Sequence, residues 1–328
     1  MAMGATPPVP LVVIAGATAS GKSALGVYLA QQLGGEVVCC DSTQLYRHFD
    51  IGTGKPTQEE RGGVPHHLLD LLEPWEIFTA GAYRERAVAV LEELRGRQCL
   101  PIVTAGTGLY LRALLEGLAA APVRSEELRA RLSEQASKRG AGYLHRLLGR
   151  LDAAAAGRIA PQDEPKLLRA IEVCLLAGKP ITEVHRAARP GLPGFTAVKI
   201  GLMPPRAELY ARIERRVEEM LRAGWPEEVR GLLARGVPAS AKPFQFIGYG
   251  QLAAHLGGEC SLAEATQGVQ QATRQYAKRQ VTWFRRERDI HWLEGFGHEG
   301  EIQKQAQEYL EGQLGGQKIS RRRGSQGL

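Results

Sequence analysis

Apolar and polar residues alternate in blocks along the first part of the chain, and the blocks predict strands that are each followed by a helix. Apolar runs at 11–15, 36–40 and 100–104 have the length of buried strands, and helical spacing of apolar residues follows at 22–33, at 81–97 and from Leu109 onward. This alternation is typical of a doubly wound parallel sheet, in which ligands bind at the carboxyl ends of the strands.

The pattern changes between residues 121 and 190, where no strand-like run is found. Arg and Ala become frequent, and amphipathic spacing predicts short helices at 125–139, 143–151, 152–159 and 164–177. A further strand is predicted at 196–202, and long helices at 206–223 and 262–288. We therefore expect an α/β core of residues 1–121 and 191–314, a helical insertion of residues 122–190, and a disordered basic tail of residues 315–328.

The loop after the first predicted strand, residues 16–23, matches the P-loop pattern G-x-x-x-x-G-K-[ST]. Its glycines let successive N–H groups point at an anion, and the next helix adds the positive end of its dipole. Lys22 would reach the outer phosphate oxygens and Ser23 would offer its hydroxyl to Mg²⁺, the expected cofactor. The predicted fold is a P-loop α/β class: a doubly wound, mainly parallel sheet with an inserted all-helical domain. The expected phosphate-binding residues are Gly16, Ala17, Thr18, Ala19, Ser20, Gly21, Lys22 and Ser23.

Two more polar loops follow predicted strands. Asp41 comes directly after the second strand, and Thr107 follows the third. Because these positions share the carboxyl edge of the sheet, Gly16, Asp41 and Thr107 are expected to converge. The residues alone leave three interpretations of Asp41: a Mg²⁺ ligand, a base that takes a proton from a nucleophile, or a helix cap. The amide of Gln44 both donates and accepts, which suits the edge of a nucleic-acid base.

The composition is that of an ordinary globular protein with an excess of positive charge. Hydrophobic residues make up 44% of the chain and the formal net charge is +7, which favours an acidic partner such as nucleic acid without requiring one. The five cysteines include no C-x-x-C pair, which argues against a disulfide framework and a zinc site and fits a reducing cytosol. No run is long enough for a signal peptide or a membrane span, so we expect a cytoplasmic protein without membrane contact. His66 and His67 are interpreted as structural or substrate-loop residues, since nothing nearby completes a metal site.

Positive charge gathers near the end of the last predicted helix. Six Lys and Arg residues stand between 274 and 288 against the single acidic residue Glu287, and Trp283 and Phe284 lie within the run. This pattern fits phosphate contacts by a helix that an aromatic residue anchors to the core, and it also fits a solvated charged face. Residues 244–249, with three aromatic side chains and a Gln, fit either RNA contact or a core element.

Several segments, taken in order, resemble the tRNA dimethylallyltransferase family, also called tRNA isopentenyltransferases. This family transfers a dimethylallyl group from its diphosphate to N6 of the adenosine 3′ of the anticodon and releases diphosphate. Ala17 stands where the family often has Pro and Ala105 where it often has Gly, and both replacements are small residues that leave the expected activity in place. The P-loop alone is generic, whereas the ordered set is specific. The matching segments are residues 16–23, 41–47, 50–56, 65–70, 106–110, 246–249 and 278–285.

The resemblance implies a role for individual residues. Asp41 would be the general base on N6 with Thr107 beside it, and Arg216 a second cation on the diphosphate; Arg215 and Arg216 point about 100° apart on a helix. Ser23 would be the metal ligand. The implied partners are the anticodon stem-loop of tRNA and dimethylallyl diphosphate, bound by a monomer. The residues implied in tRNA contact are Asp41, Ser42, Thr43, Gln44, Thr107, Arg129, Pro165, Lys166, Leu167, Leu168, Arg169, Gln245, Phe246, Ile247, Gly248, Tyr249, Lys278, Arg279, Gln280, Val281, Thr282, Trp283, Phe284 and Arg285.

Three other functions fit parts of the pattern. A small-molecule P-loop kinase would use the helical insertion as a lid and would consume a nucleoside triphosphate. An adenylate isopentenyltransferase would prenylate a free nucleotide, but it needs neither the insertion nor the long basic helix. A non-catalytic RNA-binding protein does not explain an intact P-loop together with Asp41.

Overall fold

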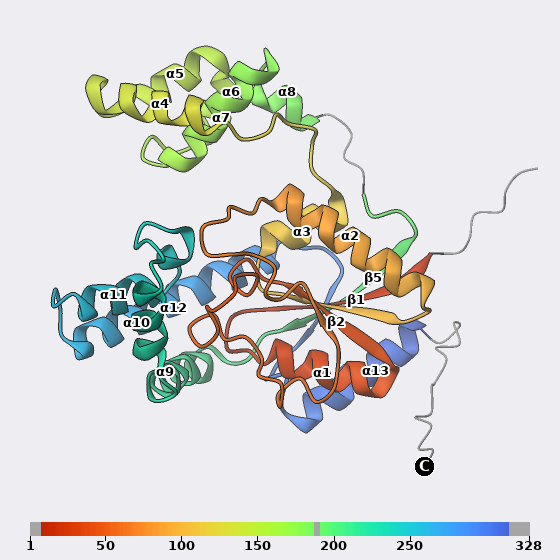
Figure 1. The fold of residues 1–328 in the computed structure, drawn as a ribbon. Helices are drawn as coiled ribbons and strands as arrows, with labels where there is room; N and C mark the ends of the chain where they lie inside the picture. The colour runs from red at the N-terminus through yellow and green to blue at the C-terminus, as the bar shows by residue number, and fades with distance from the viewer. Residues whose placement is uncertain (1–7, 187–190, 315–328) are drawn as a thin grey trace, which may run out of the picture. The chain divides into compact units, whose positions relative to one another are not determined.

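The structure, a computed structural model, describes residues 8–186 and 191–314. Within these residues the centre of the fold is a six-stranded sheet whose strands all pair in parallel, in the order β3-β2-β4-β1-β5-β6 (Figure 1). The predicted doubly wound parallel fold is therefore confirmed. The strands are β1 (Val9–Gly16), β2 (Gly35–Cys40), β3 (His66–His67), β4 (Leu100–Ala105), β5 (Phe195–Leu202) and β6 (Ile290–Leu293).

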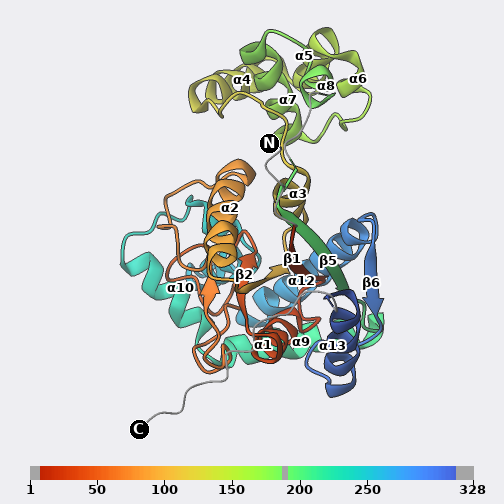
Figure 2. The same ribbon diagram turned by 90° about the vertical axis from the view of Figure 1, so that its right-hand side faces the viewer.

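Strand β1 is buried on both faces, which explains its unbroken apolar sequence. Leu11 and Val13 point into one hydrophobic cluster, which helices α2 (Ala80–Gly96) and α3 (Gly108–Glu116) help to form. Val12 and Ile14 point into the opposite cluster with α1 (Lys22–Leu33) and α13 (Gly300–Leu314). Figure 2 shows α1 and α13 side by side on that face. Helix α13 is absent from the sequence-based prediction.

The connections of β1 create a switch point in the sheet. The chain leaves β1 toward β2 and β3 and then returns to β4, which lies directly beside β1. Later it adds β5 on the other side of β1 and then β6. Ligands of doubly wound sheets bind at the carboxyl ends of the strands where the direction of connection reverses. The P-loop after β1, Asp41 after β2 and Thr107 after β4 all lie at this edge.

Helices that follow β5 extend the cluster formed by α2 and α3. Trp225 and Tyr249 pack edge to face in its interior, and the ring of Phe49 lies 4.8 Å from that of Tyr249. Gly248 has a left-handed conformation, and a Cβ there would clash with the ring of Trp225. These elements are α9 (Arg206–Arg222), α10 (Trp225–Ala234), the short 3₁₀ helix η1 (Lys242–Gln245), α11 (Tyr249–Leu256) and α12 (Leu262–Phe284).

Helix α12 ends earlier than the basic sequence pattern predicts. The prediction runs to residue 288, whereas the helix stops at Phe284. Turn-type hydrogen bonds follow, from Arg286 N to Trp283 O and from Glu287 N to Phe284 O. Asp289 then takes a positive φ of 59°, which redirects the chain into β6. Tertiary pairing of β6 with β5 therefore overrides the local helical preference.

Residues Glu116–Gly191 form a second compact unit that is entirely helical in its described part. Helices α5 and α7 lie where the sequence predicts them, α6 is a single turn within the longer predicted segment, and α8 was not predicted. Leu148, Leu167 and Ile171 are at the centre of the unit's own hydrophobic cluster. The helices are α4 (Glu126–Arg139), α5 (Tyr143–Leu151), α6 (Ala153–Ala156), α7 (Glu164–Ala177) and α8 (Ile181–Arg186).

A buried carboxylate organises the polar side of the helical unit. Glu172 has a side-chain exposure of 0% and accepts hydrogen bonds from Arg129 at 3.0 Å, Arg169 at 2.6 Å and the Ser125 amide at 2.7 Å. Burial raises the pKa of Glu172, but these donors outweigh it and keep the pKa below its ordinary value. Arg129 and Arg169, both expected to contact tRNA, are thus held by this unit's own core.

Two expectations concern the ends and the surroundings of the chain. The disordered tail expected at 315–328 lies outside the described residues. Within the described residues, none of the helices has the length and apolarity needed to cross a membrane.

Candidate active site

The P-loop has a backbone conformation of the kind that binds anions. Ala19 and Gly21 take positive φ values of 63° and 90°, as in anion-binding nests. The loop is held from behind, because Gly297 N donates to Ser20 O at 2.9 Å. A Cβ at Gly21 would lie only 2.7 Å from Gly297 N, so the two backbones require this glycine to approach. The cradle therefore depends on a segment near the other end of the chain.

Ser23 lies in the first turn of α1 and is exposed. Magnesium keeps most of its ligands as water or substrate oxygens and needs only one or two from the protein. In the described part of the chain, no group of three or more His, Cys, Asp or Glu side chains could hold a metal ion. An exposed hydroxyl in the first turn after a P-loop therefore fits a Mg²⁺ ion that would take most of its ligands from phosphate oxygens and water.

Lys22 points back onto its own loop in this structure, where its ammonium donates to Ala17 O at 2.7 Å. Burial lowers its pKa to about 8, while the Asp41 carboxylate raises it and the Arg216 guanidinium lowers it again. Lys22, Asp41 and Arg216 therefore lie close enough to influence one another's charge. An incoming anion would take over the ammonium from the Ala17 carbonyl.

Asp41 and Thr107 meet across the ends of β2 and β4. Asp41 Oδ1 accepts from the Thr43 amide at 2.9 Å and from its hydroxyl at 2.7 Å. Thr107 Oγ1 accepts from the Ser42 amide at 3.0 Å. Asp41 Oδ2 faces Gly106, where a Cβ would clash with it. One carboxylate oxygen is thus fixed by Thr43, while the other remains available to accept a proton.

Arg216 and its neighbour Arg215 have different environments on α9. Arg215 is exposed, whereas Arg216 is half-buried and its guanidinium presses against Gly54, where a Cβ would clash with it. Burial, followed by repulsion from Arg212, lowers the pKa of Arg216. Arginine remains protonated at any working pH, so the pair Lys22 and Arg216 gives the site two cations near one carboxylate.

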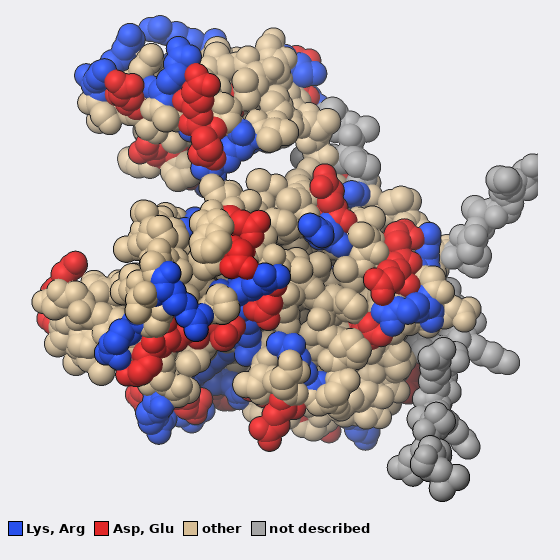
Figure 3. All heavy atoms as spheres, viewed as in Figure 1, with Lys and Arg blue, Asp and Glu red and all other residues tan. Residues whose placement is uncertain are grey.

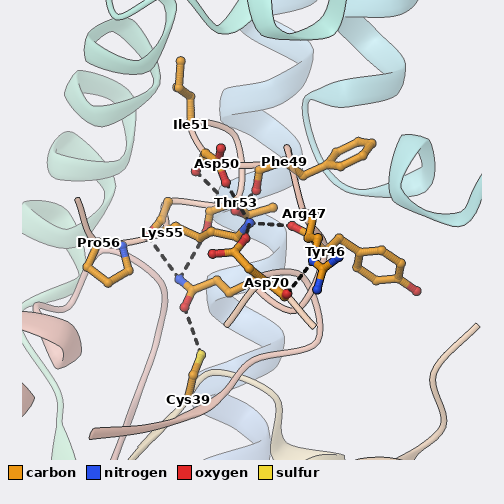
Figure 4. A network of polar contacts seen from close by, with 12 residues as sticks. Cys39, Tyr46, Arg47, Phe49, Asp50, Ile51, Thr53, Lys55, Pro56 and Asp70 are labelled. Carbon is orange, nitrogen blue, oxygen red and sulfur yellow. Dashed lines mark hydrogen bonds and ion pairs between the residues drawn. The ribbon is translucent and has the colours of Figure 1, made fainter. Parts of the chain in front are cut away.

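The loop after β2 is shaped by a buried lysine that sequence reasoning left without a role (Figure 4). The ammonium of Lys55 donates to Asp50 Oδ1 at 2.7 Å, to Asp70 Oδ1 at 2.5 Å and to the Tyr46 carbonyl. A buried ammonium is stable only with such partners. The segment Asp50–Lys55 is therefore held as a compact loop beside Arg216.

Gln44 also serves this loop in the structure. Its side-chain oxygen accepts from Cys39 Sγ at 3.0 Å, and its nitrogen donates to Gly54 O at 3.1 Å. Both polar atoms of the amide therefore have partners within the protein. The expected contact of Gln44 with a base edge would have to replace or share these hydrogen bonds.

Several residues expected to contact tRNA face inward. Leu167 and Leu168 belong to the core of the helical unit, and Tyr249, Gln280 and Phe284 are buried in the α/β unit. The Tyr249 hydroxyl donates to Glu228 Oε1 at 2.7 Å. Their side chains build or brace the fold, and direct RNA contact by them stays a prediction that their burial argues against.

Other expected contacts face outward. On α12, Lys278, Arg279 and Thr282 are exposed, and Arg285 follows at its C-terminal end. Trp283 keeps 38% of its surface exposed and packs over Gly108, next to Thr107. Of the other residues in the expected set, Pro165, Lys166 and Gln245 are exposed, and Phe246, Ile247 and Val281 are half-buried.

The net positive charge is not gathered into one patch on the face drawn in Figure 3. Acidic and basic side chains there lie next to one another. Ion pairs such as Arg47–Glu73 account for part of this mixing. An RNA surface therefore has to be argued from particular unpaired cations rather than from net charge.

Sequence reasoning assigned no role to Tyr276, and it placed Gly106 in a family-matching segment without a role of its own. The Tyr276 hydroxyl lies 3.4 Å from Gly106 O and also neighbours the Thr107 side chain. Burial raises the pKa of Tyr276, so its hydroxyl stays a donor. Tyr276 precedes Gln280 by four residues and therefore shares its helix face, a signal that was present in the sequence.

The fold and the site together define a P-loop α/β protein in which Asp41 lies at the same edge of the sheet as the P-loop. The IPP transferase family matches residues 44–287. A tRNA dimethylallyltransferase of Koribacter versatilis is 50% identical over 300 residues, covering 92% of this chain and 97% of that protein. The chain belongs to the IPP transferase family.

Solved structures agree with this assignment. A full-length tRNA isopentenylpyrophosphate transferase from Bacillus halodurans superposes with a TM-score of 0.70 at 35% identity, covering 94% of this chain and 97% of that one. A eukaryotic dimethylallyltransferase acting on tRNA superposes with a TM-score of 0.73 at 27% identity, covering 87% and 74%.

The lowered pKa of Lys22 predicts a pH dependence of diphosphate binding. The ligand-free protein keeps Lys22 charged below pH about 8 and loses that charge above it, whereas a bound anion favours the charged form. A diphosphate monoester has lost its own last proton by about pH 6–7. Its affinity should therefore fall by up to about tenfold per pH unit above pH 8, with uptake of one proton.

Calorimetry in buffers of different ionisation enthalpy measures both the affinity and the proton uptake. The control Lys22→Arg should show no such proton uptake, and equal behaviour of the two proteins would contradict the assignment.

Proposed function

We propose that this protein transfers a dimethylallyl group from dimethylallyl diphosphate to N6 of the adenosine 3′ of the anticodon in tRNA. The observation that carries the proposal is the pairing of a P-loop cradle, flanked by Lys22 and Arg216, with the Asp41–Thr107 loop contact at the same edge of the sheet. Membership of the IPP transferase family and relatives named for this reaction support it.

Stabilisation of the leaving group is the first task of the site. The bond from the allylic carbon to the diphosphate oxygen breaks as a bond to N6 forms, and negative charge gathers on the departing diphosphate. The charge would be stabilised by groups that are in place before the reaction: the P-loop N–H groups, Lys22 and Arg216. A magnesium ion held by Ser23 and the diphosphate oxygens would supply further neutralisation of the leaving group.

Removal of a proton from N6 is the second task. The exocyclic amine of adenine is a weak nucleophile because its lone pair is delocalised into the ring. Asp41 Oδ2 would accept the N6 proton while Thr43 holds Oδ1 in place. Thr107 would hold the Asp41 loop from the neighbouring loop, because its hydroxyl accepts from the Ser42 amide.

Recognition of RNA rests on outward groups near this site. A base inside a stem-loop must leave its stack before N6 can reach Asp41. Lys278, Arg279 and Arg285 offer cations for phosphates, and the partly exposed ring of Trp283 lies beside Gly108 at the Thr107 loop.

An assay with alternative acceptors tests the function. The purified protein is incubated with dimethylallyl diphosphate, Mg²⁺ and either tRNA or AMP, and the nucleosides are analysed by mass spectrometry. N6-dimethylallyl adenosine should form with tRNA and not with AMP. Turnover with AMP alone would identify an adenylate isopentenyltransferase. Phosphoryl transfer in a parallel reaction that contains ATP would identify a kinase.

The base role of Asp41 predicts a separation of rate from binding. Asp41→Asn keeps an oxygen that can accept from Thr43 but cannot take a proton, so kcat should fall by about 10²–10⁴-fold. The affinity for tRNA, measured by filter binding, should remain largely intact. A loss of tRNA affinity as large as the loss of kcat would contradict the role of Asp41 as the general base.

The two adjacent arginines provide a matched pair of variants. Arg216→Ala removes a half-buried cation next to Lys22, and kcat should fall by about 10²–10³-fold because the leaving group loses one stabilising charge. Arg215→Ala removes an exposed cation from the same helix and should leave kcat near that of the wild type. Equal losses in both variants would contradict the placement of Arg216 on the diphosphate.

A further inference from the structure

Gln280 stands out in α12 because it is a buried polar residue within an exposed basic segment. Its exposed fraction is 6%, whereas Lys278 and Arg279 directly before it are exposed. A buried amide must satisfy both its oxygen and its nitrogen. The role of Gln280 can therefore be inferred from its two hydrogen-bond partners.

The two ends of the amide bind two different parts of the site. Gln280 Oε1 accepts from the backbone N–H of Thr18 at 2.7 Å, and Gln280 Nε2 donates to the carbonyl of Gly106 at 2.8 Å. A side-chain amide accepts at its oxygen and donates at its nitrogen, so Gln280 can hold both groups at once. Thr18 belongs to the P-loop, and Gly106 directly precedes Thr107.

The position of Gly106 affects both Asp41 and the loop that carries Thr107. Its backbone lies against Asp41 Oδ2, where a Cβ would clash, and its own N–H donates to Cys40 O at 3.1 Å. The Tyr276 hydroxyl approaches the same Gly106 carbonyl at 3.4 Å from one turn earlier on α12. A shift of Gly106 would therefore move the loop that carries Thr107 relative to Asp41.

We propose that Gln280 is a positioning residue that sets the spacing between the diphosphate cradle and the Asp41–Thr107 loops, and that it acts on the diphosphate substrate rather than by touching RNA. The inference rests on the proposed function for the identity of that substrate. It differs from the resemblance, which implies Gln280 in tRNA contact. The geometry assigns Gln280 to the inward face of α12, where it bridges the P-loop and the Thr107 loop.

The bridge predicts which step suffers when it is lost. Without Gln280, the Thr18 N–H and the Gly106 carbonyl are buried without their partner, and each loop relaxes to find another. The amides of the cradle then lose their common focus, so anion binding weakens. The allylic carbon is also displaced from N6, so kcat falls as well. The exposed cations on α12 are unchanged, so the affinity for tRNA should not change.

The test compares Gln280→Met with Gln280→Glu and with a matched control. Methionine preserves the length of the side chain without its polar atoms, while glutamate can still accept from Thr18 but, as a carboxylate, cannot donate to Gly106. Gln275→Met changes an exposed glutamine on the same helix. Circular dichroism and thermal unfolding of the full-length proteins establish folding, and Gln280→Glu serves as the variant if the methionine protein does not fold.

Three measurements separate the outcomes. Calorimetry with inorganic diphosphate and Mg²⁺ should show about tenfold weaker binding for both Gln280 variants, equivalent to about 1.4 kcal/mol. The KM for dimethylallyl diphosphate should rise and kcat should fall, while Kd for tRNA matches that of Gln275→Met. Weakened tRNA binding with unchanged diphosphate binding would overturn the inference. A wild-type protein that fails to prenylate tRNA, with the diphosphate-binding difference still present, would instead refute the proposed function and leave the bridge in place.

Discussion

The site depends on one backbone constraint: a single loop must keep positive φ values at Ala19 and Gly21, the conformation of an anion-binding nest. Such a loop has no internal reason to stay open, so the rest of the protein has to hold it. Gly297 fixes it from behind through Ser20, and Gln280 fixes it from the side through Thr18. The position at the switch point of the sheet brings the Asp41 and Thr107 loops alongside. The cradle is therefore a product of tertiary structure, although its eight residues are contiguous in the sequence.

The site holds two half-buried cations close together, Lys22 and Arg216. Lys22 and Arg216 repel each other, and burial disfavours both charges, as their lowered pKa values show. The Asp41 carboxylate offsets only part of this cost. Under the proposed function, a bound diphosphate would offset the remainder. Functional sites are the places where such locally unfavourable arrangements persist, because the surrounding core holds them.

Local signals in the sequence predict much of this fold. The strands at β1, β2 and β4, the P-loop and the helices α1, α5 and α7 all follow from apolar spacing and glycine placement. The elements that were missed or misjudged have weak local signals or non-local causes: β6 has four residues, and the end of α12 is set by a chain reversal at Asp289. The Gln280–Thr18 hydrogen bond joins residues 262 positions apart, and nothing in the pattern near either residue marks it.

The basic segment at the end of α12 shows why a contiguous motif need not have a single role. A helix turns each successive side chain by about 100°, so neighbouring residues face different surroundings. Lys278 and Arg279 face outward, while Tyr276, Gln280 and Phe284, each four residues apart, share the face turned toward the catalytic loops and the core. Mutations within this short segment should therefore divide into two classes according to helix face. Under the proposed function, the outward face would hold RNA, and the inward face would set the spacing of the P-loop and the Thr107 loop.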